Sequence, residues 1–134
     1  ALSMEGSLKL KEVSYIHSES YAAGELKHGT ISLIDEDVPV IAVATQTDII
    51  PKTISNVVEV KSRGAKVILV CTDACARELK DGVADYVIEI PHTDELLMPI
   101  TAVVPLQILA YYTSINRGID PDKPKNLAKS VTVE

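Results

Sequence analysis

Three charged residues near the start of the chain have a spacing at which their side chains could act together. Glu5, Lys9 and Glu12 follow one another at intervals of four and three residues. In an α-helix, which turns by about 100° per residue, they fall within roughly 60° of one another. A carboxylate–ammonium–carboxylate row beside apolar residues can take up and release protons. The same row could be a solvated face stabilised by ion pairs one turn apart.

The residues around this row contain further groups with possible chemistry. The stretch 5–29 mixes acids, bases and two histidines with small and apolar residues, a mixture that burial of a helix face does not require. Lys11 lies about 200° around the helix from Lys9, so we expect it to be solvated. His28 precedes Gly29 at an expected helix end, where a lone histidine is most often a cap or a hydrogen-bonded polar residue. His17 and His92 are interpreted as structural or exposed.

Three short aliphatic runs predict the strands of a sheet that would position these residues. They cover residues 38–44, 66–71 and 86–90. The runs are largely apolar and continuous rather than alternating, as is typical of a parallel sheet covered on both faces. Thr45, Thr47 and Thr72 lie near the ends of two runs, at the edge where such sheets bind ligands, and are candidate contacts.

Helical patterns separate and flank the predicted strands. We expect helices over residues 49–63, ended by Gly64, and over 73–80. Thr93 can cap a segment that precedes a longer helix over 99–116, in which Pro99 stands first and Pro105 predicts a kink.

The order of elements is helix, helix, strand, helix, strand, helix, strand, helix and tail. This alternation predicts an α/β fold with a doubly wound parallel sheet and helices on both faces. Three strands with none ahead of the first helix form an incomplete set, so we expect a longer protein whose preceding sequence supplies at least one more strand. We divide the chain into a domain over 1–117 and a C-terminal arm over 118–134, which contains Pro121 and Pro124.

Composition excludes several classes of function. The net charge of −6 argues against binding to nucleic acid or to an anionic membrane. The longest apolar region, residues 96–112, is interrupted by polar residues and prolines and is shorter than the roughly 20 residues of a membrane span. Cys71 and Cys75 are interpreted as small buried hydrophobes, and their spacing is not that of a metal site. No signal peptide is apparent, so we expect a soluble, cytoplasmic protein.

Two long motifs at opposite ends of the chain resemble one enzyme family. The stretch E-G-S-L-K-L-K-E-V-S-Y-I-H-S-E-S-Y-A-A-G-E-L-K-H-G, residues 5–29, is similar to the start of the second sugar-isomerase (SIS) subdomain of glutamine–fructose-6-phosphate aminotransferases. The final N-L-A-K-S-V-T-V-E, residues 126–134, resembles the C-terminus of that family, and V-P-L-Q-I-L-A-Y-Y, residues 104–112, also fits. The resemblance covers essentially the whole chain.

The resemblance implies an activity and a set of site residues. In that family, ammonia from glutamine replaces the keto oxygen of fructose 6-phosphate, and isomerisation then gives glucosamine 6-phosphate. A glutaminase domain and a first SIS subdomain, which carries most of the phosphate-binding loop, lie outside this sequence. Glu12 matches the isomerisation base and Lys9 matches an active-site lysine, while Glu5 could orient Lys9. The fragment alone is expected to be inactive in the full reaction.

Three more positions are matched through the resemblance. His28 corresponds to a histidine that opens the sugar ring in the site of the neighbouring subunit, which implies a homodimer. Lys129 corresponds to a lysine that can form a Schiff base with the sugar, and the backbone at Ala128 lines the sugar site. Family members commonly have proline after K-H-G, and Thr30 stands there in this chain.

Two other interpretations remain open from the sequence. The chain could belong to a deglycase or ketose–aldose isomerase of the same fold that uses no glutamine. It could also be a regulatory module that binds a sugar phosphate without catalysis. Neither a metal nor a cofactor is expected, and no phosphate-cradling glycine motif occurs in the sequence.

Overall fold

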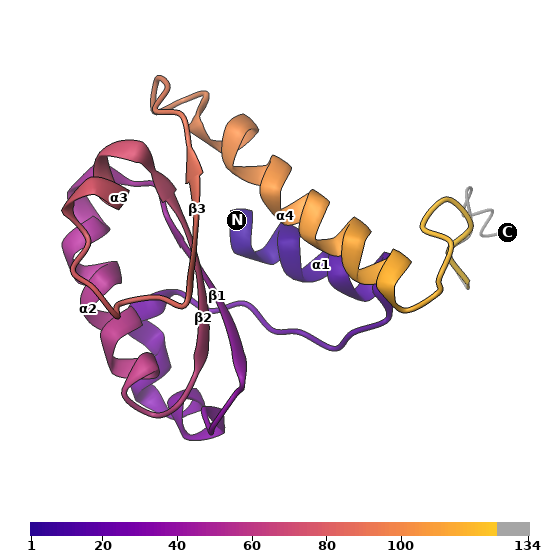
Figure 1. Cartoon of the computed structure of the whole chain (residues 1–134), viewed down its shortest axis with the longest axis horizontal. Helices are drawn as coiled ribbons and strands as arrows, with labels where there is room; N and C mark the ends of the chain where they lie inside the picture. The colour runs from indigo at the N-terminus through magenta and orange to yellow at the C-terminus, as the bar shows by residue number, and fades with distance from the viewer. Residues whose placement is uncertain (126–134) are drawn as a thin grey trace, which may run out of the picture.

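The structure is a computed structural model that describes residues 1–125 as a three-layer α/β arrangement (Figure 1). Three parallel strands lie in the order β1-β2-β3 between two helical layers. The elements in chain order are α1 (Leu2–Ser14), η1 (Ala23–His28), η2 (Thr30–Leu33), β1 (Pro39–Ala44), η3 (Thr47–Ile49), α2 (Ile50–Lys61), β2 (Lys66–Thr72), α3 (Asp73–Glu78), β3 (Tyr86–Ile90) and α4 (Met98–Asn116), where η marks a 3₁₀-helix.

The central strand β2 shows why the strand runs are continuously apolar. Val67 and Leu69 face the layer of α2 and α3, and Val70 faces the layer of α4. All three side chains are fully or almost fully buried. In Figure 1 the sheet stands edge-on, with α2 and α3 on its left and α1 and α4 on its right. The predicted α/β fold, with a parallel sheet and helices on both faces, is therefore confirmed.

The helix boundaries differ from the predicted ones in places where local hydrogen bonds decide them. The helix expected over 49–63 begins as the 3₁₀ turn η3 and continues as α2. The helix expected over 73–80 ends at Glu78. The helix expected before His28 is 3₁₀ rather than α, and a second 3₁₀ turn, η2, follows it. Thr93 does not cap a helix, because its hydroxyl contacts the Asp94 carbonyl and Thr101 instead.

Gly64 ends α2 as the sequence predicts, and its conformation shows why glycine is required. Its φ is +95°, in the left-handed region, and a β-carbon at this position would lie 2.9 Å from the α-carbon of Glu36. The N–H of Gly64 donates to the Lys61 carbonyl and that of Ala65 donates to the Val60 carbonyl, which is the Schellman pattern. The chain therefore turns directly from α2 into β2.

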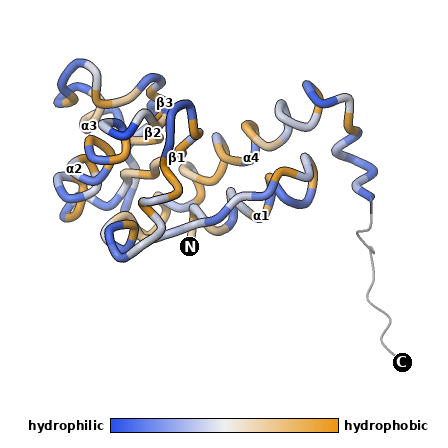
Figure 2. Tube along the Cα trace, turned by 90° about the horizontal axis from the view of Figure 1, so that it is seen from below, coloured by the Kyte–Doolittle hydropathy of each residue, from blue (hydrophilic) through white to orange (hydrophobic). Residues whose placement is uncertain are grey.

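Helices α1 and α4 pack side by side, as the views in Figures 1 and 2 both show. Gly6 allows the close approach, because a β-carbon there would lie 3.1 Å from a methyl carbon of Leu106. The buried hydroxyl of Ser114 on α4 donates to the Val13 carbonyl at the end of α1 over 2.7 Å. This contact satisfies one of the carbonyls that the last turn of α1 leaves without a helical partner.

Helix α4 is the one helix in the described part of the chain that is long and apolar enough to cross a membrane by length and composition alone. Only 28% of its apolar window is buried. The buried side, which includes Ala102, Leu106 and Ala110, packs against α1 and the sheet. Length and composition therefore do not exclude a membrane span. The packing of the buried side of α4 against α1 and the sheet is what weighs against one. Exposed apolar side chains cover the other side: Ile100, Val104, Ile108, Tyr111, Tyr112 and Ile115.

A polar cluster around Asp85 stabilises the start of the sheet. The Asp85 carboxylate accepts hydrogen bonds from the Lys61 ammonium and the Val67 N–H, at 2.6 and 2.7 Å, and pairs with Lys66 at 3.1 Å. The pKa of Asp85 lies well below its ordinary value, because the carboxylate accepts hydrogen bonds from Lys61, from the Val67 amide and from Lys66. Asp85 thus joins α2, β2 and the start of β3.

We predict that Gly6→Val destabilises the α1–α4 contact. The added side chain must displace Leu106, and overpacking of this kind costs about 1–3 kcal/mol. Chemical denaturation monitored by circular dichroism would measure the loss. Gly24→Ala is the matched control, because a β-carbon there meets no atom within 4 Å. An equal effect of both variants would contradict the close approach.

We predict that Asp85 makes the fold sensitive to acid. Its folded-state pKa is lower than its unfolded-state value of about 4, so its contribution is complete above the unfolded value and is lost as pH falls toward the folded value. Asp85→Asn should lower the melting temperature at pH 7 and flatten its decrease below about pH 5. Melting curves between pH 3 and 7 would test this, and an unchanged acid slope would contradict it.

Candidate active site

Lys9 lies between two carboxylates on α1, as the helical spacing predicts. Its ammonium nitrogen is 2.6 Å from an oxygen of Glu12 and 3.5 Å from an oxygen of Glu5. The three side chains are partly exposed, at 31% for Lys9, 26% for Glu12 and 39% for Glu5. The row is therefore neither a buried ion pair nor a fully solvated face, and a ligand could reach it.

The electrostatics of the row fix the protonation state of the lysine. The Glu12 hydrogen bond, and after it the charges of Glu12 and Glu5, raise the pKa of Lys9, while partial burial opposes them. Lys9 is therefore an ammonium at neutral pH. In this state it can donate hydrogen bonds and stabilise negative charge, but it cannot act as a base. The acceptor of protons in the row is a carboxylate.

Hydrogen bonds between serines hold the face of α1 that lies opposite the charged row. Ser7 exchanges hydrogen bonds of 2.9 and 3.1 Å with Ser18, and Ser20 donates to Ser3 over 2.8 Å. Ser7 lies two residues from Lys9, which is about 200° around the helix. The segment after α1 thus runs back along one face and leaves the row of Glu5, Lys9 and Glu12 free.

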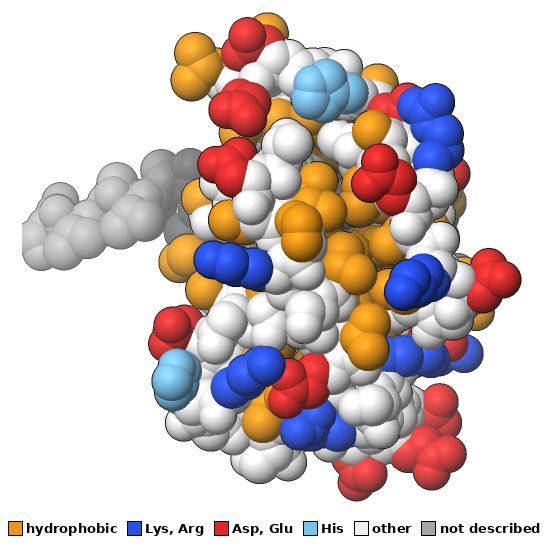
Figure 3. Space-filling model, turned by 90° about the vertical axis from the view of Figure 1, so that its left-hand side faces the viewer, with side chains coloured by type: hydrophobic (Ala, Val, Ile, Leu, Met, Phe, Trp, Pro, Cys, Tyr) orange, Lys and Arg blue, Asp and Glu red, His pale blue; other side chains and the backbone are white. Residues whose placement is uncertain are grey.

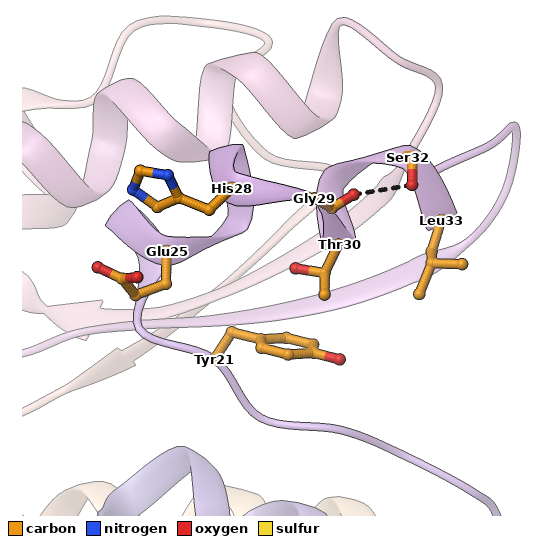
Figure 4. Close-up of a pocket in the computed structure, with 7 residues that line it drawn as sticks. All are labelled: Tyr21, Glu25, His28, Gly29, Thr30, Ser32 and Leu33. Atoms are coloured by element: carbon orange, nitrogen blue, oxygen red, sulfur yellow. Dashed lines mark hydrogen bonds between the residues drawn. The ribbon is translucent and has the colours of Figure 1, made fainter.

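His28 lines an open pocket of about 480 Å³ at η1 and η2 (Figure 4). The lining residues are Tyr21, Glu25, His28, Gly29, Thr30, Ser32 and Leu33. Gly29, with φ of +152°, forms the junction between the two 3₁₀ turns. Figure 4 shows the Glu25 and His28 side chains at one end of the pocket and Leu33 at the other.

The structure does not bring His28 to the charged row of the same chain. Leu26 and Ile31, from η1 and η2, pack into the core between the sheet and α2, and Lys27 pairs with Glu59 of α2 at 2.6 Å. Helix α1 lies on the other side of the sheet, against α4. His28 and Glu12 therefore belong to different layers.

Thr30 is a pocket residue whose role the sequence analysis missed. Its hydroxyl is the one buried side-chain polar atom without a hydrogen-bond partner among the residues that the structure describes. In Figure 4 this hydroxyl is turned toward the Glu25 side. The sequence offered one signal for Thr30, which stands where family members commonly have proline. Only the tertiary structure shows that its hydroxyl has no hydrogen-bond partner.

The three threonines near the strand ends, Thr45, Thr47 and Thr72, have different surroundings in the structure. Thr72 is buried, and its hydroxyl accepts a 3.4 Å hydrogen bond from the Cys75 N–H as the N-cap of α3. Capping uses one acceptor site of the Thr72 hydroxyl, and a contact between Thr72 and a ligand stays a prediction. Thr47 begins η3, and Thr45 precedes it as a partly buried residue.

The cysteines have the predicted structural character. Cys71 and Cys75 are both buried, and burial raises the pKa of the Cys71 thiol to about 12. A protonated thiol of this kind is a poor nucleophile and a poor metal ligand. Within residues 1–125, no group of three or more His, Cys, Asp or Glu residues could hold a metal ion.

Ala128 and Lys129 lie outside the described residues, so their predicted roles stay predictions. The described part of the arm follows α4 and reaches Lys125, whose backbone N–H donates to the Tyr15 hydroxyl. Tyr15 follows directly after α1. The last described residues thus lie beside the end of the helix that carries the charged row.

The surface beside α2 and α3 carries charges of both signs rather than a basic field. Figure 3 shows Lys and Arg side chains interspersed with Asp and Glu, and exposed apolar side chains between them. The described part of this face therefore has no clustered cations of the kind that bind a phosphate backbone.

Comparisons with known proteins show the family to which this fold belongs. Residues 1–117 match the family described as SIS domain. The chain belongs to the SIS domain family. It is 57% identical to the glutamine–fructose-6-phosphate aminotransferase (isomerizing) of Clostridium perfringens, over 99% of this chain and 22% of that protein. It is 52% identical to the protein of the same name in Thermococcus kodakarensis, over 98% of this chain and 21% of that protein.

Solved structures show the same SIS arrangement. The C-terminal domain of glucosamine-fructose-6-phosphate aminotransferase from Francisella tularensis is similar with a TM-score of 0.85 at 39% identity, over 91% of this chain and 34% of that chain. Glucosamine-6-phosphate deaminase of Thermotoga maritima is similar with a TM-score of 0.73 at 29% identity, over 97% of this chain and 36% of that chain. This SIS chain spans about a fifth of the curated relatives it matches.

We predict opposite stability effects for two threonine-to-valine variants. Thr30→Val removes an unpaired buried hydroxyl and should raise the free energy of unfolding by about 1 kcal/mol. Thr72→Val removes the N-cap of α3 and should lower it by about 1 kcal/mol. Urea denaturation would compare the two, and a destabilising Thr30→Val would show that this hydroxyl has a partner within the protein.

Proposed function

We propose that this SIS chain is the C-terminal isomerase part of an enzyme that converts fructose 6-phosphate and glutamine to glucosamine 6-phosphate and glutamate. The observation that carries the proposal is the accessible Lys9–Glu12 pair at 2.6 Å on α1. The high identity to aminotransferases of that name over nearly the whole chain supports it. The glutaminase activity would come from sequence outside this chain.

In the proposed reaction, Glu12 is the base that moves a proton between neighbouring sugar carbons. Ammonia adds to the ketose carbonyl and water leaves, which gives an imine. The carboxylate then takes a proton from the first carbon while the imine nitrogen gains one, which gives an enaminol. Return of the carboxyl proton to the second carbon and loss of the proton on the first carbon's hydroxyl give the 2-amino aldose. Lys9, held as an ammonium, would stabilise negative charge that develops on the sugar and would fix the orientation of Glu12.

The remaining site residues would come from two other places. Lys129 and the backbone of Ala128 would approach the sugar from the C-terminal arm, residues 118–134, while residues 1–117 form the subdomain that carries the charged row. His28 would open the sugar ring in the site of a neighbouring subunit. The separation of η1 and α1 on opposite sides of the sheet supports action in trans and therefore a homodimer. The exposed apolar side of α4 also favours a partner surface.

The proposal needs neither metal nor cofactor, since a carboxylate base and ammonium groups supply the proton transfer and the charge stabilisation. We infer a cytoplasmic protein, because its proposed substrates are phosphorylated metabolites. No nucleic-acid or membrane partner is proposed.

The structural similarity to a glucosamine-6-phosphate deaminase favours a second candidate, a deglycase or isomerase that acts without glutamine. Its 29% identity is well below the 57% identity to an aminotransferase. The two candidates differ in one measurement, because only the aminotransferase requires glutamine for formation of the amino sugar.

We predict that Glu12→Gln in the full-length protein lowers amino-sugar formation from fructose 6-phosphate by about 10²–10⁴-fold, because the amide cannot accept the proton. Glutamine hydrolysis should persist, which would show that the rest of the enzyme is folded. Glu95→Gln, at an exposed turn before α4, is the matched control. Near-normal product formation by Glu12→Gln would remove Glu12 from the role of base.

A further inference from the structure

Tyr15 has an unusual backbone conformation at the end of α1. Its φ and ψ are 55° and 31°, in the left-handed region, and it shares positive φ with only one other non-glycine residue in the described chain, Asp37. This conformation is unfavourable for a residue with a side chain, so surrounding contacts must hold it. The backbone N–H of Tyr15 donates to the Leu10 carbonyl, which closes the helix.

The side chain of Tyr15 makes a contact across 110 positions of sequence. Its hydroxyl accepts a hydrogen bond from the backbone N–H of Lys125. The Tyr15 side chain therefore links the end of α1 to the last described residue of the C-terminal arm. The left-handed backbone at Tyr15 sets the direction in which this ring leaves the helix.

Hydrogen bonds of the Ser114 hydroxyl hold the other end of the described arm. The Ser114 hydroxyl lies 2.7 Å from the Val13 carbonyl and 3.1 Å from the Ile119 carbonyl, so it joins the end of α1 to the start of the arm. The Ile119 N–H also donates to the Ser114 carbonyl at 3.0 Å. Both ends of the segment from Gly118 to Lys125 are thus attached to the last turn of α1 or the residue after it.

The segment between the two ties is itself a compact turn. The Lys123 N–H donates to the Asp120 carbonyl at 3.2 Å, and the Asp122 N–H donates to the Asp120 carboxylate at 3.0 Å. These bonds leave the arm little freedom of its own. The Tyr15 contact then holds Lys125, the last described residue of the arm.

We propose that Tyr15 is a positioning residue that anchors the C-terminal arm at the end of α1, the helix that carries the Lys9–Glu12 pair. The proposal rests on the proposed function, in which Lys129 reaches the sugar from this arm. Tyr15 lies three residues after Glu12, and Lys125 lies four residues before Lys129. The anchor therefore fixes Lys125, from which the lysine-bearing segment starts, at the end of the helix that carries the base.

Chain statistics give the size of the expected effect. Four residues separate the Lys125 anchor from Lys129, and a chain of four residues extends at most about 14 Å. Without the anchor, the nearest described tie is Ile119, ten residues from Lys129. Because effective concentration falls roughly as the −3/2 power of the connecting length, the Lys129 amine should become roughly fourfold more dilute at the site.

The test compares Tyr15→Phe with Tyr86→Phe in the full-length protein. Tyr15→Phe removes only the hydroxyl that accepts from Lys125. Tyr86→Phe removes a hydroxyl on β3 and keeps the ring that faces the Lys66 ammonium at 5.8 Å. Two readouts are taken at matched thermal stability: tryptic cleavage after Lys125, and borohydride trapping of fructose 6-phosphate on Lys129. Trypsin does not interfere at Lys123, because Pro124 follows it.

We expect Tyr15→Phe to speed cleavage after Lys125 and to slow trapping on Lys129 by roughly fourfold, with Tyr86→Phe unchanged in both. Cleavage equal to that of the unmodified protein would overturn the anchor. Faster cleavage with unchanged trapping would overturn the positioning role. If the unmodified protein neither turns over fructose 6-phosphate nor traps it on Lys129, the proposed function fails, and the cleavage comparison still decides whether Tyr15 anchors the arm.

Discussion

The close packing of α1 against α4 is the constraint on which the candidate site depends. Gly6 lets the two helices approach until Leu106 fills the space that a side chain would occupy, and Ser114 supplies the Val13 carbonyl with a donor. This contact fixes the rotation of α1 about its axis. Once that rotation is fixed, the row of Glu5, Lys9 and Glu12 must lie at the accessible side of the helix.

The two halves of the candidate site are held by different cores. Helix α1 rests on α4 and on the sheet face that Val70 lines, whereas η1 and η2 pack with α2 on the face that Val67 and Leu69 line. A sheet separates the charged row from the His28 pocket within one chain. For this reason the proposed function assigns His28 to the site of a neighbouring subunit.

Local sequence patterns were sufficient to predict the strands, the end of α2 and the ion pairs of the charged row. The continuous aliphatic runs gave the three strands because a parallel sheet covered on both faces leaves no polar positions in its centre. Gly64 gave the end of α2 through its left-handed conformation, and the four-and-three spacing of Glu5, Lys9 and Glu12 gave the ion pairs because helix periodicity alone brings them together. The motifs at the two ends indicated the SIS family.

Only the tertiary structure decided contacts between residues far apart in sequence, because no local pattern encodes them. It assigned the Thr72 hydroxyl to a cap of α3 and left the Thr30 hydroxyl without a partner in the pocket of His28. It also placed Lys125 against Tyr15, 110 positions away. The sequence by itself determined which helix carries the charged row, since that depends on helix periodicity. The packing of α1, α4 and the arm determined what surrounds the row, since that depends on how the chain returns through space.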